Sequence, residues 1–118
     1  MHLTEVDFGA ALPVDGYGAD FFRLGGVAHP APILAVAGRV MPWGGYEDAA
    51  TLSELAGRVD VLLVGTGGQI AHIPAALRKD LEEAGLGVEV MDSPAACRTY
   101  NVLLSESRRV ALAVLPVG

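Results

Sequence analysis

The run Asp60-Val-Leu-Leu-Val64 contains no alternation of polar and apolar residues. A strand with one face in water shows that alternation, so an unbroken apolar run predicts a strand that is covered on both faces. Such strands are common in parallel sheets, whose faces are covered by crossover helices. Ile33–Ala37 has the same apolar character and predicts an interior strand, and Arg109–Leu115 predicts a final strand. The sequence therefore favours an α/β fold in which further layers cover a central sheet.

Segments with helical periodicity separate the strands of the second half. Residues 47–57 read as a helix with acids in its first turn, and four apolar residues of this region share one face. A second helix is expected to begin at Pro74, because proline suits a first helical position. The two apolar stripes are Leu52, Leu55, Ala56 and Val59, and Ile73, Leu77, Leu81 and Ala84. This alternation of helices and strands predicts a sheet with helices on one or both faces.

The first third has the features of a hairpin. Gly25-Gly26 separates the short apolar segment Phe21–Leu24 from Val27–His29, and both glycines accept a positive φ. Pro30 cannot donate a ladder hydrogen bond, so the returning strand is expected at an edge or a bulge. Residues 1–19 read as an irregular or loosely paired lead-in. An antiparallel hairpin beside a parallel α/β unit predicts a mixed sheet.

Length and hydropathy bound the organisation of the chain. Its 118 residues and 12.2 kDa predict one domain over residues 1–118, long enough to bury a core without disulfides or metals. The apolar content is 52% and the mean hydropathy is +0.42, which is high for an ordinary globular chain. Both sheet faces are therefore expected to be covered, or a partner covers apolar surface. A homodimer is compatible with this composition.

Charge and targeting signals exclude several classes of function. The net charge of −6 argues against a nucleic-acid partner, which would require a basic face. No apolar run approaches the roughly 20 residues of a membrane-spanning helix. The opening Met1–Glu5 lacks the features of a signal peptide, so we expect a cytoplasmic protein. The lone cysteine cannot form an internal disulfide, and no cluster has zinc-ligand spacing, so neither a metal nor a cofactor is expected.

The segment Val88–Leu104 joins a buried strand to a helix that carries a row of polar side chains. The strand is expected to end at Asp92, with Ser93 capping the helix and Pro94 at its first position. The run Asp92–Leu104, together with Val61–Gly67, resembles the Mth938-like domain family. That family includes a mitochondrial complex I assembly factor and an adipogenesis-associated relative.

The resemblance extends over roughly residues 17–117. It implies a three-layer α/β fold with a mixed central sheet, packed helices and an accessory N-terminal β-hairpin. It brings no established catalytic motif. It implies a shared binding site at Arg98, Thr99, Tyr100 and Asn101, without identifying what binds there.

Gly65-Thr-Gly-Gly68 follows a buried strand and precedes a helix. A glycine loop in that position can direct backbone N–H groups at an anion. The spacing is poor for a dinucleotide fingerprint, because Ile70 occupies the third glycine position, and no lysine follows as in a P-loop. The alternative interpretation is a tight turn between strand and helix.

Cys97, His72 and Asp92 are the available nucleophile, base and acid. A thiol near a helix start and beside Arg98 would have a lowered pKa. The alternative is structural, since Ala95-Ala96-Cys97 also reads as a patch of small packing residues. We therefore assign no catalytic residue.

Arg98-Thr-Tyr-Asn101 places four hydrogen-bonding side chains at the start of a core-facing helix. In a structural interpretation Arg98 pairs with Asp92, Thr99 and Asn101 bond loop carbonyls, and the Tyr100 hydroxyl finds a partner. In a functional interpretation the segment is a recognition surface, because arginine and tyrosine are frequent at interface hot spots.

These features predict a cleft at the carboxyl edge of the sheet, where α/β folds place ligands. The first hypothesis is a small interaction or assembly protein without catalysis that binds a protein partner there, because polar and aromatic residues cluster while no catalytic set is complete. The second is a small-molecule or anion-binding protein, conceivably an enzyme, that uses the glycine loop and Arg98. The candidate binding residues are Trp43, Gly65, Thr66, Gly67, Asp92, Arg98, Thr99, Tyr100 and Asn101. For Trp43, which follows a strand, the alternatives are a lid on the core and an exposed anchor.

Overall fold

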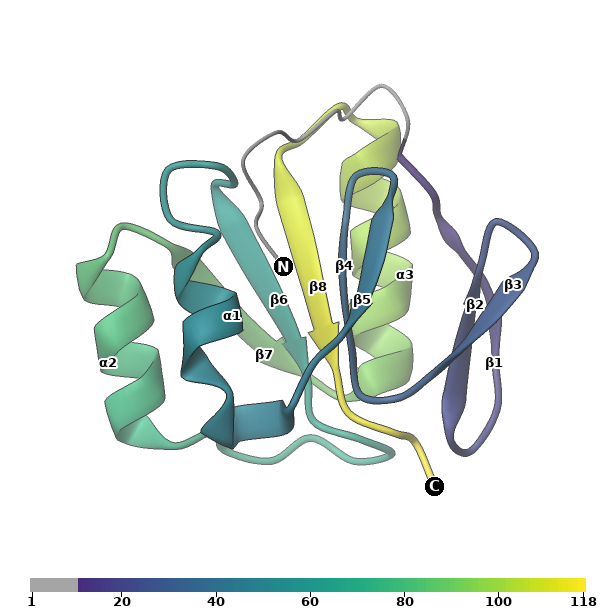
Figure 1. The fold of residues 1–118 in the computed structure, drawn as a ribbon, viewed down its shortest axis with the longest axis horizontal. Helices are drawn as coiled ribbons and strands as arrows, with labels where there is room; N and C mark the ends of the chain where they lie inside the picture. The colour runs from purple at the N-terminus through teal and green to yellow at the C-terminus, as the bar shows by residue number, and fades with distance from the viewer. Residues whose placement is uncertain (1–10) are drawn as a thin grey trace.

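The computed structural model describes residues 11–118 and contains a mixed five-stranded sheet, in the order β5-β4-β8-β6-β7 (Figure 1). β6 pairs in parallel with both β7 and β8, whereas β4 pairs antiparallel with β5 and β8. The mixed sheet predicted from the sequence is thus confirmed. Its strands are β4 (Ile33–Val36), β5 (Arg39–Pro42), β6 (Val61–Gly65), β7 (Gly87–Met91) and β8 (Val110–Val114).

A second sheet has three short antiparallel strands, β1 (Val14–Tyr17), β2 (Phe21–Leu24) and β3 (Val27–Pro30). The predicted turn at Gly25 and Gly26 is confirmed, with φ values of +58° and +81°. Within the lead-in predicted over residues 1–19 as irregular or loosely paired, Val14–Tyr17 forms β1, which pairs with β2 through a register irregularity between Val14 and Gly16. Residues 1–10 lie outside the described part of the chain.

Helices cover both faces of the five-stranded sheet. α1 (Ala49–Ser53) and α2 (Ala75–Glu83) lie on one face, and α3 (Ser93–Ser105) lies on the other, beside the three-stranded sheet (Figure 1). β8 is buried along its whole length, as expected for a strand covered on both faces. Among residues 11–118, every helix is too short or too polar to cross a bilayer.

The helix predicted over residues 47–57 is broken into smaller pieces. A 3₁₀ turn, η2 (Gly45–Glu47), precedes the short α1. Asp48 lies between them with φ −98° and ψ 66°, which is not helical, and its side chain accepts a hydrogen bond from Thr51 N. Asp48 therefore caps α1 instead of lying in its first turn, because its carboxylate competes for the free backbone N–H groups.

Two apolar cores follow from this layering. The first lies between the sheet and the α1–α2 layer and includes Leu52, Leu77 and Val88. The second lies between the sheet, α3 and the three-stranded sheet, and includes Phe22 and Leu112. Because β6, β7 and β8 run parallel to one another, the loops at their carboxyl ends lie at the same edge of the sheet.

Candidate functional site at the carboxyl edge of the sheet

Three parallel strands end at the same edge and bring distant segments together. β6 ends in the glycine loop, β7 ends at the start of α3, and β8 continues into the C-terminal tail (Figure 1). The Ser93 hydroxyl joins all three, because its Oγ accepts from Gly67 N at 2.9 Å and donates to Leu115 O at 2.7 Å. The structure therefore places the glycine loop and the Asp92 junction side by side.

The cap of α3 differs from the prediction. Asp92 is the N-cap residue, and its Oδ1 accepts from Ala95 N at 2.8 Å. Ser93 is the first helical residue and is fully buried. The prediction that Ser93 caps the helix was wrong because its hydroxyl is needed between the glycine loop and the C-terminal tail.

The glycine loop is closely packed and its first amides are bonded within the fold. Thr66 N donates to Met91 O at 2.9 Å, and Gly67 N donates to Ser93 Oγ. A Cβ on Gly65 would lie 2.8 Å from Ser93 Cα, and a Cβ on Gly68 would lie 2.6 Å from Val117 O. These contacts favour the tight turn over a loop that directs its amides at an anion.

Cys97 has the environment of a packing residue. Its side chain is 3% exposed in the core under α3. Burial raises the pKa of the Cys97 thiol to about 12, against the smaller opposing effect of the Arg98 charge. The thiol is therefore protonated at neutral pH and is a weak nucleophile. His72, the candidate base, lies on the exposed segment that leads to α2.

Asn101 attaches the three-stranded sheet to α3. Its Oδ1 accepts from Val14 N and its Nδ2 donates to Val14 O, both at 2.8 Å. The Asn101 amide thus pairs with both backbone groups of a residue in β1. The structural interpretation of the sequence had predicted a carbonyl in a loop as its partner. Because one side chain satisfies both polar groups of Val14, Asn101 has a structural role here.

Tyr100 is fully buried, and its hydroxyl lacks a hydrogen-bond partner among the described residues. The expectation that this hydroxyl finds a partner is therefore wrong for residues 11–118. Burial also raises the pKa of the Tyr100 phenol. A buried hydroxyl without a partner costs stability because its hydration is lost without replacement.

The substitution Tyr100→Phe is therefore expected to stabilise the protein. We expect the free energy of unfolding to rise by about 1 kcal/mol, because the ring is kept and only the unpaired hydroxyl is removed. Urea denaturation of the variant and the wild type measures the difference. The control is Tyr46→Phe, since Tyr46 is only partly buried. An unfolding midpoint lowered in Tyr100→Phe would show that the hydroxyl has a favourable partner.

Arg98 and Thr99 remain available at the surface of α3. Arg98 is exposed, and within residues 11–118 its guanidinium forms no hydrogen bond or ion pair. The expected Arg98–Asp92 pair is not formed there, because the Asp92 carboxylate caps α3. Thr99 is half-buried.

Trp43 is a core residue. Its side chain is 2% exposed, Nε1 donates to Asp48 O at 3.2 Å, and its ring meets Tyr46 edge-on at a centroid distance of 6.0 Å. It lies with the α1–α2 core, whereas Arg98 is exposed on α3 across the sheet. The candidate binding residues therefore do not share one lining.

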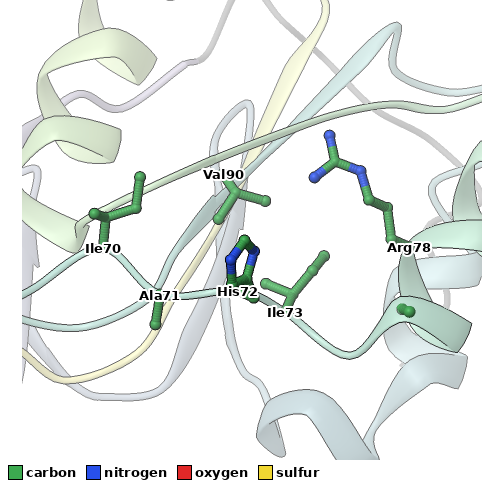
Figure 2. A pocket seen from close by; sticks show the side chains of 7 residues that line it. Ile70, Ala71, His72, Ile73, Arg78 and Val90 are labelled. Atoms are coloured by element: carbon green, nitrogen blue, oxygen red, sulfur yellow. The ribbon is translucent and has the colours of Figure 1, made fainter.

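A cavity of about 540 Å³ opens beside this edge, between the segment after the glycine loop, the start of α2 and β7 (Figure 2). The sequence did not indicate this cavity, because Ile70 lies in a segment without helical or strand periodicity and Ile73 reads as part of the apolar stripe of the next helix. The one signal was Ile70, an apolar residue in an otherwise loop-like stretch. The lining residues are Ile70, Ala71, His72, Ile73, Ala75, Arg78 and Val90. Within residues 11–118, no cluster of His, Cys, Asp or Glu side chains is suited to hold a metal ion.

Comparison of the sequence with known proteins identifies an uncharacterised bacterial protein and several assembly factors as relatives. The chain is 50% identical over 117 residues to an uncharacterised protein of Rhodobacter capsulatus, covering 99% of this chain and 94% of that protein. It is 34% identical to NADH dehydrogenase (ubiquinone) 1 alpha subcomplex assembly factor 3 of Drosophila melanogaster, covering 96% of this chain and 62% of that protein. For the same factor of Xenopus tropicalis the identity is 29%, with coverage of 95% and 65%. The chain thus spans less than two thirds of these assembly factors.

Solved structures share the whole architecture. An outer membrane protein from Bartonella henselae superposes with a TM-score of 0.82 at 32% identity, covering 95% of this chain and all of that chain. A Mth938-like domain from Bordetella pertussis superposes with a TM-score of 0.77 at 30% identity, covering 100% and 94%. The family described as protein of unknown function (DUF498/DUF598) matches residues 14–115. With that match and these neighbours, the chain belongs to this family and has the Mth938-like fold.

Proposed function

We propose that this protein is a non-catalytic assembly factor that binds a protein partner through the surface of α3 around Arg98 and Thr99. The relatives named assembly factor 3 align with almost the whole of this chain, which supports a role of the same kind. The burial and protonation of Cys97 support a binding role over thiol catalysis.

The observation that carries this proposal is the state of Arg98. Its neighbours in the polar row serve the fold, since Tyr100 is buried and Asn101 bonds Val14. Arg98 alone in that row is exposed, and its guanidinium has no hydrogen bond or ion pair with the described residues. An exposed arginine without a hydrogen bond or ion pair to the described residues, in a segment that carries the family resemblance, is suited to contact a partner.

The substitution Arg98→Ala is expected to reduce partner recovery at least about tenfold, equivalent to about 1.4 kcal/mol of binding free energy. The tagged protein is recovered from cells that express it naturally, and bound proteins are quantified by mass spectrometry. The control is Arg108→Ala, which removes the same charge from an exposed position beyond the end of α3. Circular dichroism checks that both variants fold. Equal recovery by Arg98→Ala and the wild type would exclude this surface.

A further inference from the structure

Among the strands of residues 11–118, β7 lies at an edge of the five-stranded sheet, since it pairs with β6 on one side and with no described strand on the other. The backbone of Gly87 and Met91 faces β6: Gly87 N donates to Asp60 O, and Met91 O accepts from Thr66 N. Backbone groups alternate in direction along a strand. The N–H and C=O groups of Val88 and Val90 therefore face away from β6, toward the open side.

One of these outward residues is already used by the protein. Arg78 of α2 donates from Nη2 to Val88 O at 3.1 Å. For Val90, the structure records no hydrogen bond on the open side within residues 11–118. A free N–H and C=O on an edge strand form a template for pairing with another extended chain.

The same residue forms part of the cavity. The Val90 side chain lines it together with Ile70 and Ile73, and His72 and Arg78 provide its nitrogen-bearing groups (Figure 2). Ile70 is 66% exposed, so its apolar side chain is accessible at the mouth of the pocket. Val90 thus combines free backbone groups at a sheet edge with an adjoining apolar pocket. This combination suits binding by strand addition, in which an extended peptide pairs with the edge strand through main-chain hydrogen bonds and places alternate side chains in pockets.

We propose that the open edge of β7 and the adjoining pocket bind an extended segment of a protein partner. An apolar side chain of that segment enters the pocket, and a carboxylate two residues away faces Arg78. Residues two apart lie on the same side of a strand at a spacing of about 7 Å, which suits one pocket with a cation at its rim.

Charge favours an acidic partner segment at this position. Arg78 is the one formally charged residue among those that line the pocket. Its intramolecular partner Glu82 is 3.6 Å from Nε, and both side chains are about half exposed, so this pair is weak. A partner carboxylate can therefore replace Glu82 on the guanidinium while Nη2 continues to donate to Val88 O.

A second copy of the chain fits this edge less well. In an antiparallel pair of two β7 strands that bonds Val88 to Val90 of the other copy, Glu89 lies opposite Glu89. Like charges directly opposite each other destabilise a strand pair. Each copy also carries a net charge of −6.

This inference rests on the proposed role in binding a protein, but it concerns a different surface. Random seven-residue peptides displayed on phage are selected on the full chain, and enriched peptides are synthesised with scrambled controls. We expect enrichment of an apolar residue two positions from an aspartate or glutamate. Arg78→Ala should weaken binding of the synthesised peptides at least tenfold in fluorescence anisotropy. Lys79→Ala, which removes an exposed cation from a neighbouring hollow, should leave binding within twofold.

Amide exchange measured by NMR provides a readout at the edge itself. In the free chain the Val90 amide should exchange quickly, whereas the Glu89 amide, which faces β6, should be protected. A saturating peptide should slow exchange at Val90 at least tenfold and leave Glu89 unchanged.

Three results would overturn the proposal: no peptide that binds better than its scrambled form, binding that Arg78→Ala does not weaken, or Val90 protection in the free chain that rises with protein concentration. The last result would assign the edge to a second copy. Loss of partner recovery in Arg98→Ala bears only on the proposed function, so the two ideas can fail separately.

Discussion

Replacing Gly65 with alanine is expected to lower the free energy of unfolding by about 3 kcal/mol, because the new methyl group overpacks a closed junction. The added Cβ would lie 2.8 Å from the backbone Cα of Ser93 and 2.6 Å from Val114 Cγ1. Ser93 cannot move away easily, since its hydroxyl bonds Gly67 N and Leu115 O. Urea denaturation with linear extrapolation gives the loss.

Gly26→Ala is the matched control for this substitution. Gly26 has a positive φ of +81°, but a Cβ there meets no atom within 4 Å. Gly26→Ala is expected to lower the free energy of unfolding by about 1 kcal/mol, which measures only the cost of a positive φ in a residue with a Cβ. If Gly65→Ala were no less stable than Gly26→Ala, the close packing of β6 on the start of α3 would be disproved.

The substitution Asn101→Ala is expected to cost about 2 to 3 kcal/mol of stability, because two hydrogen bonds are lost and both polar groups of a buried residue, Val14, lose their partner. Hydrogen exchange should also accelerate at the Val14 amide. Urea denaturation measures the first effect and NMR the second.

Two further variants separate the contributions of Asn101. Asn101→Asp keeps an acceptor for Val14 N but cannot donate to Val14 O, so we expect an intermediate loss. Val102→Ala truncates the next residue of α3, whose side chain is 54% exposed, and should change stability by less than about 0.5 kcal/mol. A loss in Asn101→Ala as small as that in Val102→Ala would contradict the attachment of β1 to α3.

Local sequence patterns made the main elements predictable. The unbroken apolar runs at β6 and β8 indicated strands covered on both faces, and the two glycines at 25 and 26 indicated the β2–β3 turn. The family resemblance supplied the layer arrangement. These signals are local, so they do not depend on which distant segments meet.

The parts that failed depend on contacts between distant segments. Both Asp92 and Ser93 can cap a helix, and the choice follows from Gly67 and Leu115, which reach Ser93 only in the folded chain. Trp43 lies in a glycine-rich loop, where the local pattern fits both a core lid and an exposed anchor, and only the folded chain shows its burial. The cavity at Ile70 likewise follows from β7 lying beside a segment without regular structure.

The position of β8 has a consequence for how the chain reaches its native state. β8 is the last strand of the chain, yet it lies between β4 and β6 in the five-stranded sheet. Without β8, the remaining strands are two separate pairs, β5–β4 and β6–β7, with no ladder between them. During synthesis, the pairs β5–β4 and β6–β7 can therefore join into one sheet only after residues 110–114 have left the ribosome. Closure by such non-local pairing is slow, and it leaves apolar strand edges exposed to other chains meanwhile.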